Sequence, residues 1–308
     1  MSSLLADEIR AAAIRLAPHV ARTPLRPARA IGENARFKCE NLQHTGSFKL
    51  RGALNKILLL SDAQRDAGVV TSSTGNHGLA VAEALRIAGG RGTIVVSSSA
   101  SPYKVDRLRT AGLEVIVDSD DPMRAELNAR ALAESTGRVY VSPYNDLEVV
   151  AGQGTVGVEI AEQWPEVEAV YIAVGGGGLI AGVATWLNSV KPTVRIVGCW
   201  PENASGLLAS IEVGKIVEVV ESPTLSDGTA GNLEPGAITL PLCIDLIDAH
   251  VLVSEREIAR AMMDVQRDDG DRIEGAAGVA VAGYRKLVAE QTEYATLGSV
   301  IVLCGGNA

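Results

Sequence analysis

The stretch AVYIAVGGGGLIAGVATWL, residues 169–187, joins an apolar strand, four consecutive glycines and an apolar helix. A strand with no polar alternation is typical of a parallel sheet that is covered on both faces. The glycines at 175–178 allow successive backbone N–H groups to converge on an anion, and the start of the following helix adds a partial positive charge. The stretch therefore predicts an α/β protein with a phosphate cradle at the carboxyl end of a strand.

Two other interpretations of this glycine loop have to be weighed. Gly176, Gly178 and Ala181 formally match the dinucleotide pattern G-x-G-x-x-A. That pattern also requires an acidic residue at the end of the next strand to hold a ribose, and the segment 195–199 leads into Trp200 instead. The loop could also be a purely structural turn, although four glycines cost backbone entropy that a plain turn does not require.

The rest of the chain repeats the alternation of strand and helix. Val- and Ile-rich runs alternate with Ala-rich runs from residue 66 onward, the pattern of a parallel sheet with crossover helices. Strands are expected at 68–73, 92–97, 114–118 and 138–142, then at 169–174, 195–199 and from 299, with helices that include 78–88, 102–111 and 180–190. We expect a small domain, residues 46–148, inserted in a large domain, residues 1–45 plus 149–308, with ligand in the crevice between them.

Composition and charge exclude several classes of protein. With 308 residues, 47% hydrophobic and 4% aromatic, the chain suits a two-domain α/β protein. A net charge of −9 argues against a nucleic-acid partner, which needs clustered Lys and Arg. The apolar runs fall short of the about 20 residues that span a bilayer, and the N-terminus lacks a secretory core. The four cysteines show no ligand or disulfide spacing. We therefore expect a cytoplasmic protein without a membrane partner.

A lysine gives the first indication of chemistry. Lys49 lies in KCENLQHTGSFKLRGALNK, residues 38–56, where it follows a Gly-Ser-Phe turn and opens a helix. A lysine beside small residues and Phe48 suits an imine partner for an aldehyde cofactor. By itself, it is more simply explained as a solvated lysine in the first turn of a helix.

A polar turn changes that interpretation. The segment TSSTGNHGLAVAEAL, residues 71–85, places Ser72, Ser73, Thr74 and Asn76 at a strand end, just before a helix. These groups and the helix N-terminal amides around His77 can bind a carboxylate, whereas an N-cap would explain only one hydroxyl. A lone histidine in a first turn is more often a structural hydrogen-bonding residue than an acid or base. An amine, an anion cradle and a carboxylate clamp together suit an aldehyde-phosphate cofactor that handles amino acids.

On these segments the chain resembles the fold-type II pyridoxal-phosphate enzymes, and within them the serine/threonine dehydratase and serine racemase group. The resemblance runs from Thr23 to Asn307 through the motifs ENLQHTGSFKLRGA, SSTGNHG, AGQGT, GGGGLIAG, SDGTAG, EGAAGVA and CGGN. It implies a tryptophan-synthase-β-like α/β fold of two open, twisted, mostly parallel sheets with helices on both faces. It also implies the cofactor pyridoxal 5'-phosphate and a homodimer.

The resemblance assigns cofactor-binding roles by position. Lys49 corresponds to the Schiff-base lysine, Phe48 flanks the cofactor ring, and Asn76 meets its 3-hydroxyl. Glu274 lies beside the ring, and Cys304 stands where a serine or threonine normally meets the pyridine nitrogen. The cofactor-binding positions are Phe48, Lys49, Asn76, Gly175, Gly176, Gly177, Gly178, Leu179, Glu274 and Cys304.

The same resemblance places the substrate. Ser73, Thr74 and His77 fall where the group binds the substrate carboxylate, with Asn76 beside them, and Gly228 lies in the loop facing the lysine. Lys49 is the expected base for the Cα proton. Thr74, the second expected catalytic residue, stands where the racemases carry a serine on the opposite face of Cα, and its extra methyl restricts its side chain.

The implied reaction is removal of the β-hydroxyl of a β-hydroxy-α-amino acid such as L-serine or L-threonine, giving a 2-oxo acid and ammonia. The neutral thiol of Cys304 cannot keep the ring nitrogen protonated, which favours elimination over reprotonation. Serine racemase is the main alternative. A β-replacement synthase is less expected because a threonine commonly follows the asparagine in that branch, and a sensor without turnover is less expected because Lys49 and its surroundings are intact.

Three further features bear on substrate and control. The stretch 221–242 resembles an offshoot linked to hydroxyectoine breakdown and hydroxyaspartate dehydration. For such an acidic substrate, Arg124 could pair with the second carboxylate, although an arginine on the surface of a helix is the simpler interpretation. Trp200 and Gly206 stand where metal-activated members carry acidic ligands, so no metal site is expected, although Glu202 could supply one ligand elsewhere. The chain stops just after CGGN, so no C-terminal regulatory domain is expected.

Overall fold

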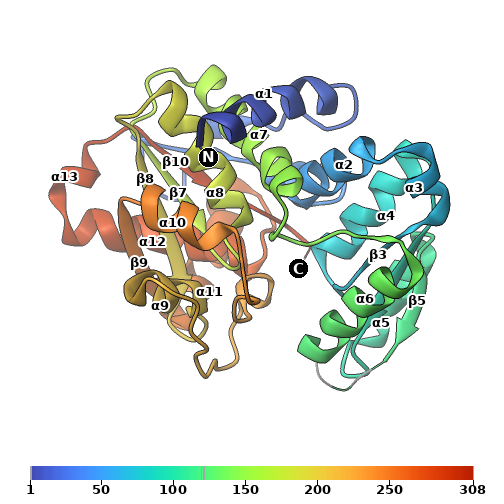
Figure 1. The fold of residues 1–308 in the computed structure, drawn as a ribbon. Coiled ribbons are helices and arrows are strands. Elements are labelled where there is room, and N and C mark those ends of the chain that lie inside the picture. The colour runs from blue at the N-terminus through green and yellow to red at the C-terminus, as the bar shows by residue number, and fades with distance from the viewer. Residues whose placement is uncertain (1, 119, 121, 308) are drawn as a thin grey trace.

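The computed structural model describes residues 2–118, 120 and 122–307, and it contains two open sheets that lie side by side in Figure 1. The large sheet has six strands in the order β1-β2-β10-β7-β8-β9, and only the β1–β2 pair is antiparallel. Its strands are β1 (Leu25–Pro27), β2 (Ala35–Lys38), β7 (Ala169–Ala173), β8 (Arg195–Pro201), β9 (Ala249–Val253) and β10 (Ser299–Val302).

The small sheet has four parallel strands in the order β5-β4-β3-β6. They are β3 (Val69–Thr71), β4 (Gly92–Val96), β5 (Glu114–Val117) and β6 (Val139–Tyr140). Because all strands run the same way, the segments that follow β3 and β6 leave the sheet at one edge. That edge carries the polar turn at 72–76. It faces the large sheet, since Asn76 bonds Glu274 just before helix α12 (Gly275–Glu290), which packs on β7 and β8.

Helices cover both sheets, with α3 to α6 around the small sheet at the right of Figure 1. Helix α7 packs against both α8 and α2, and therefore joins the two halves of the molecule. The helices are α1 (Ser2–Leu16), α2 (Lys49–Leu59), α3 (Asp62–Ala67), α4 (Asn76–Ala88), α5 (Pro102–Thr110), α6 (Pro122–Thr136), α7 (Leu147–Gln163), α8 (Gly178–Val190), α9 (Gly206–Val213), α10 (Thr239–Leu246), α11 (Glu255–Asp269), α12 (Gly275–Glu290) and α13 (Thr292–Ala295), with short turns η1 (Glu40–Leu42) and η2 (Asp227–Thr229).

The core explains why the central strands carry no polar alternation. Every residue of β7 and β10 is buried, because helices cover both faces of the large sheet. Tyr171 of β7 packs edge-on against Tyr284 of α12, with ring centroids 5.0 Å apart. The α/β fold with two mostly parallel sheets, predicted from the sequence, is therefore confirmed.

Element boundaries differ from the predicted ones by a few residues. The strands predicted at 68–73 and 138–142 are shorter, and the helix predicted at 78–88 begins two residues earlier, at Asn76. Local sequence patterns did not predict that β2 lies next to β10 in the interior of the large sheet, or that β9 lies at its edge. Strand order depends on contacts between distant segments, which local patterns do not encode.

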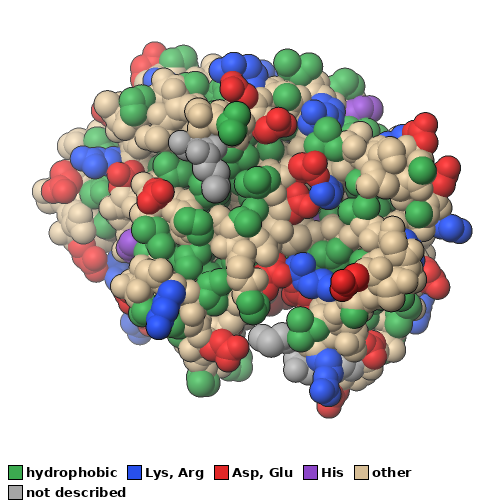
Figure 2. All heavy atoms as spheres, viewed as in Figure 1, with side chains coloured by type: hydrophobic (Ala, Val, Ile, Leu, Met, Phe, Trp, Pro, Cys, Tyr) green, Lys and Arg blue, Asp and Glu red, His purple; other side chains and the backbone are tan. Residues whose placement is uncertain are grey.

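Two observations concern the molecular surface and the character of the helices. Figure 2 shows Lys and Arg side chains interspersed with Asp and Glu on the face in view. Among the described residues, no helix has both the length and the apolar character that crossing a bilayer would require.

Candidate active site

Lys49 begins helix α2 and points toward the edge of the small sheet. Its Nζ donates a hydrogen bond to the backbone oxygen of Pro143 at 2.9 Å and lies 5.2 Å from the centre of the Phe48 ring. Burial lowers the pKa of Lys49 to about 8, against the weaker opposing influence of Glu274. A lysine amine with this pKa is partly neutral near pH 7, as a nucleophile and base requires.

The glycine loop after β7 presents backbone donors without acceptors. Gly177 has φ +85°, which turns the chain into α8, and the helix has no side-chain cap. In the described part of the chain, no acceptor bonds the amide N–H groups of residues 175–179. Convergent free amides at the N-terminus of a helix bind anions such as phosphate. The loop predicted as a phosphate cradle therefore has the donor geometry of one.

Close packing explains why this loop consists of glycines. A Cβ on Gly175 would lie 2.9 Å from the Cα of Thr229, and one on Gly176 would overlap the ring of Tyr144. A Cβ on Gly178 would lie 3.1 Å from the Cβ of Tyr144. Side chains would push Tyr144 and η2 away from the loop, so the glycines allow three segments to meet.

The polar turn before α4 offers a second group of free amides. Helix α4 begins after Gly75 without a side-chain cap, and no acceptor among the described residues bonds the amides of residues 76–78. The Ser73 hydroxyl accepts from the amide of Gly75 at 3.2 Å, and Thr74 is half-buried in the same turn. Ser72 does not face the turn as the sequence suggested, because its hydroxyl donates to the backbone oxygen of Val95.

His77 is a buried neutral imidazole rather than an acid. Burial lowers the pKa of His77 to about 3, helped by the nearby charge of Lys49. Its Nε2 lies 3.0 Å from the backbone oxygen of Val141, which holds the proton on that nitrogen. Its Nδ1 is buried without a partner among the described residues. The side chain therefore holds the turn against the segment that follows β6.

Asn76 and Glu274 meet across the space between the two sheets. The Asn76 amide nitrogen donates to both carboxylate oxygens of Glu274, at 2.8 and 3.0 Å, and its oxygen accepts from Asn307 at 2.8 Å. Burial raises the pKa of Glu274, and Asn76 only partly offsets this effect. Asn307, which the sequence analysis did not single out, also donates to the backbone oxygen of Thr45. It thereby links the segment before Lys49 to Asn76.

Cys304 lies just beyond the end of β10, beside the segment that leads to Lys49. It is 3% exposed, and its backbone oxygen accepts a hydrogen bond from the amide of Phe48 at 3.1 Å. Burial raises the pKa of this thiol well above its usual range, so the thiol is neutral at physiological pH. A neutral thiol is a weak hydrogen-bonding group.

One segment that the sequence analysis did not assign to the site contacts all three predicted parts. In residues 141–144, the oxygen of Val141 contacts His77 and the oxygen of Pro143 accepts from Lys49, while the Tyr144 ring packs on Gly176. Its signal was the dipeptide Ser142-Pro143 at a strand end, which is a turn signature without catalytic chemistry. Gly228 lies in η2, next to Thr229, which contacts Gly175.

The residues present suit a phosphate-bearing aldehyde. The glycine cradle excludes side chains, Lys49 supplies an amine, and the buried hydroxyls of Thr45 and Ser47 have no partner among the described residues. Comparison with known proteins agrees: a family model described as pyridoxal-phosphate dependent enzyme matches residues 16–305.

The chain belongs to the pyridoxal-phosphate-dependent enzyme family.

Relatives within this family act on amino acids. The chain is 42% identical to L-threonine ammonia-lyase of Thermotoga maritima over 88% of this chain and 66% of that protein, and so spans about two thirds of its length. It is 36% identical to the catabolic L-threonine dehydratase of Escherichia coli K12, over 98% of this chain and 92% of that protein. The solved structure of maize serine racemase superposes with a TM-score of 0.92 at 33% identity, covering 98% and 93% of the two chains.

Trp200 and Gly206, the two positions that lack an acidic metal ligand, are closely packed against neighbouring groups. Trp200 is buried, and its ring occupies the space where a Cβ on Gly198 would project. A Cβ on Gly206 would lie 2.9 Å from the amide oxygen of Asn232. Among the described residues there is no group of three His, Cys, Asp or Glu side chains that could hold a metal ion.

Proposed function

We propose that this pyridoxal-phosphate-dependent lyase removes the β-hydroxyl of a β-hydroxy-α-amino acid, such as L-serine or L-threonine, and releases a 2-oxo acid and ammonia. The observation that carries the proposal is the convergence on residues 141–144 of an amine with lowered pKa, a phosphate-type cradle and a turn with free amides. These are the groups needed to hold a cofactor phosphate, its aldehyde carbon and a substrate carboxylate. Similarity to L-threonine ammonia-lyase and dehydratase supports this choice of reaction.

The residues that would hold the cofactor come from both halves of the chain. The amides of residues 175–179 would bind its phosphate, Lys49 would bind its aldehyde carbon, and Cys304 would face its ring nitrogen. Asn76 and Glu274 would lie at the edge of the ring. When bound, the cofactor supplies an electron-poor ring that stabilises negative charge at the substrate α-carbon.

The chain's own groups supply the remaining chemistry. The amides of residues 76–78 and the Ser73 hydroxyl bind the substrate carboxylate, which orients the Cα–H bond toward Lys49. The Lys49 amine accepts that proton at Nζ, with its position fixed by the Pro143 oxygen. Cys304 remains a neutral thiol, so the protein adds no negative charge at the ring nitrogen. We propose that a neutral thiol at this position favours loss of the β-hydroxyl over return of the proton to the α-carbon.

Serine racemase is a second candidate, because the maize serine racemase structure matches over nearly the whole chain. Racemisation needs a second proton-carrying group on the other face of the α-carbon, and Thr74 is the hydroxyl available in the polar turn. Replacement of Thr74 by Val separates the two activities, since it removes the hydroxyl and retains the branched shape. Loss of D-serine formation with 2-oxo acid release retained would assign Thr74 to racemisation alone.

The deciding experiment measures 2-oxo acid release by the cofactor-loaded protein from L-serine, L-threonine, D-serine, β-hydroxyaspartate and phenylserine, with Lys49→Ala as control. Release from a β-hydroxy amino acid that disappears in the variant establishes a dehydratase and names its substrate. A preference for β-hydroxyaspartate would favour Arg124, which is exposed on α6, as the partner of the second substrate carboxylate. No release from any substrate would refute the dehydratase and leave racemase, β-replacement synthase or a sensor.

We also propose, from the family resemblance, that the protein is a cytoplasmic homodimer. Size-exclusion chromatography with light scattering tests the dimer directly. The division into a small domain at 46–148 and a large domain at 1–45 plus 149–308 stays a prediction. Limited proteolysis that cuts near residues 45 and 149 first would support it.

A further inference from the structure

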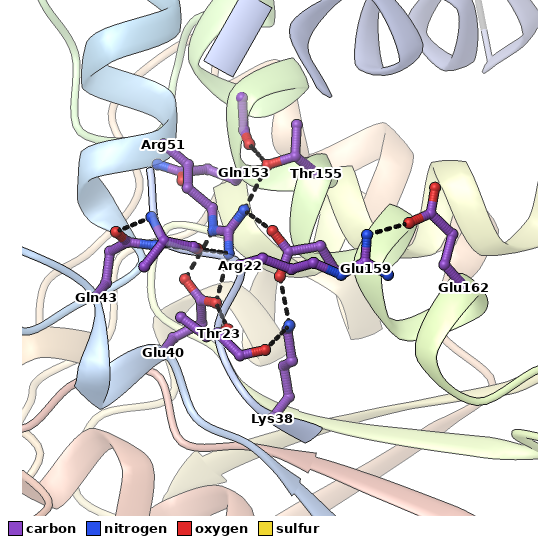
Figure 3. Close-up of polar contacts among 12 residues, drawn as sticks. Arg22, Thr23, Lys38, Glu40, Gln43, Arg51, Gln153, Thr155, Glu159 and Glu162 are labelled. Atoms are coloured by element: carbon purple, nitrogen blue, oxygen red, sulfur yellow. Dashed lines mark hydrogen bonds and ion pairs between the residues drawn. The ribbon is translucent and has the colours of Figure 1, made fainter. Parts of the chain in front are cut away.

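We infer that Arg51 is a positioning residue, which anchors the first turn of α2 to the large-sheet half and thereby sets where the Lys49 amine lies. The inference rests on the proposal that Lys49 carries the cofactor. It concerns residues that contact neither the cofactor nor the substrate, and that lie in a buried network of charges shown in Figure 3.

All the hydrogen-bonding capacity of the Arg51 guanidinium is used. Its Nε and Nη2 donate to the two carboxylate oxygens of Glu40, each at 2.8 Å, and its Nη1 donates to Glu159 at 2.7 Å. Longer contacts of 3.3 Å reach the Thr155 hydroxyl and the backbone oxygen of Ala21. An arginine has five N–H donors in a fixed fork, so these five acceptors define the orientation of its side chain.

The charges in the network balance and come from distant parts of the chain. Lys38 of β2 bonds Glu159 of α7 and donates to Gln163 at 2.9 Å and to the backbone oxygen of Thr23 at 2.8 Å. Two cations, Lys38 and Arg51, therefore face two carboxylates, Glu40 and Glu159, as Figure 3 shows.

Burial makes this network sensitive to the loss of any member. The side chains of Arg51 and Glu40 are 1% and 0% exposed. Burial alone would raise the pKa of Glu40, but the Arg51 guanidinium, together with Lys38 and the Thr23 hydroxyl, outweighs burial and holds that pKa below its usual range. Replacing a buried ion pair by apolar residues is often neutral for stability, whereas removing one partner leaves an uncompensated charge. The network is therefore better explained by the geometry it imposes than by a gain in stability.

The first turn of α2 has no side-chain cap, and apart from the bond between the Arg51 amide and the Phe48 oxygen it is held by contacts from other segments. Phe48 precedes the helix without a side-chain cap, and the amide of Gly52 donates instead to the Gln153 side chain of α7 at 3.1 Å. The two helices approach so closely that a Cβ on Gly152 would lie 2.5 Å from the backbone oxygen of Arg51. Contacts with the large-sheet half thus replace a cap and hold this turn in place.

Lys49 and Arg51 point in nearly opposite directions from the same turn, since two residues advance an α-helix by about 200°. Lys49 therefore faces Pro143 at the small sheet while Arg51 faces Glu40 in the other half. Any rotation or shift of the turn that relaxes Arg51 also moves the Lys49 amine. A shift of about 1 Å at a reacting group can cost on the order of 100-fold in rate.

The test compares Arg51→Lys with Lys56→Gln in the full chain loaded with pyridoxal phosphate. Arg51→Lys keeps a cation but loses the fork, because an ammonium has three donors at one point. Lys56→Gln is the matched control, since it removes the ion pairs with Asp146 and Glu148 from the far end of α2 and leaves the first turn intact. Three quantities are measured: cofactor affinity, the pH response of the bound cofactor's visible absorbance, and the urea-unfolding midpoint.

For Arg51→Lys we expect cofactor affinity to fall about tenfold or more and the pH midpoint of the absorbance to move, in line with a displaced reactive group. Lys56→Gln should stay within about twofold of the wild type in affinity, with an unmoved pH midpoint. Equal behaviour of the two variants in both cofactor readouts would overturn the inference and leave Arg51 a purely structural residue.

Glu159→Gln covers the case in which Arg51→Lys does not fold. It keeps the bidentate Arg51–Glu40 pair and removes one charge from the network. A changed pH midpoint in this variant supports the positioning role, and wild-type values in both cofactor readouts refute it. Because these readouts need no substrate, failure of the proposed dehydratase reaction would leave them intact and would be seen separately.

Discussion

The lowered pKa of Lys49 predicts how cofactor attachment depends on pH. With a pKa of about 8, roughly 9% of the Lys49 amine is neutral at pH 7. With the ordinary value of 10.5 only about 0.03% would be neutral, so burial raises the reactive fraction by about 300-fold. The perturbation is therefore pH itself, varied from about 6 to 10.5 on the cofactor-free chain.

The assay mixes this protein with pyridoxal phosphate, stops the reaction with borohydride and quantifies the modified Lys49 peptide by mass spectrometry. N-acetyl-lysine serves as control, because it reports the titration of the cofactor and an unburied amine under the same conditions. Relative to that control, the rate at Lys49 should be about two orders of magnitude higher at pH 7, and the advantage should disappear above pH 10. A rate that rises in parallel with the control up to pH 10 would refute the assigned pKa.

Three further predictions follow from the site. Cys304→Ser should keep 2-oxo acid release within about threefold of the wild type. Cys304→Asp should lower that release more than tenfold, because it places a carboxylate at the ring nitrogen. Equal rates of release in the two variants would contradict this role of the thiol. Gly176→Ala should weaken cofactor binding about tenfold, because the added Cβ overlaps the ring of Tyr144. A second substitution in the same chain, Tyr144→Ala, should restore most of the lost affinity, and a fluorescence titration that shows no rescue would disprove steric overlap as the cause. The pKa of His77 is lowered to about 3, so the folded state binds fewer protons than the unfolded state between pH 6.5 and 3. The free energy of unfolding that this group contributes is therefore lost as the pH falls through that window. Urea unfolding at pH 7 and pH 4 should show that His77→Gln escapes about 3 kcal/mol of acid destabilisation seen in the wild type, and equal losses would count against a buried neutral imidazole.

Local sequence patterns determined the class of fold and the type of chemistry. The apolar strand before Gly175 requires cover on both faces, and four successive glycines before a helix leave free amides for an anion. The turn at 72–76 and the lysine after Phe48 are likewise local features, since each is a short segment whose residue types restrict what it can bind. The family match and the two mostly parallel sheets agree with these inferences.

Only the tertiary structure decided how these parts act together. The segment 141–144 brings Lys49, His77 and Gly176 to one place, although its own residues carry no catalytic signature. The sequence gives Arg51 no feature that distinguishes it from other polar helix residues, but in the fold its side chain is buried against Glu40 and Glu159. The physical reason is the same in both cases: burial, ion pairing and pKa depend on groups that the fold brings together from distant positions, and no local pattern of residue types contains that information.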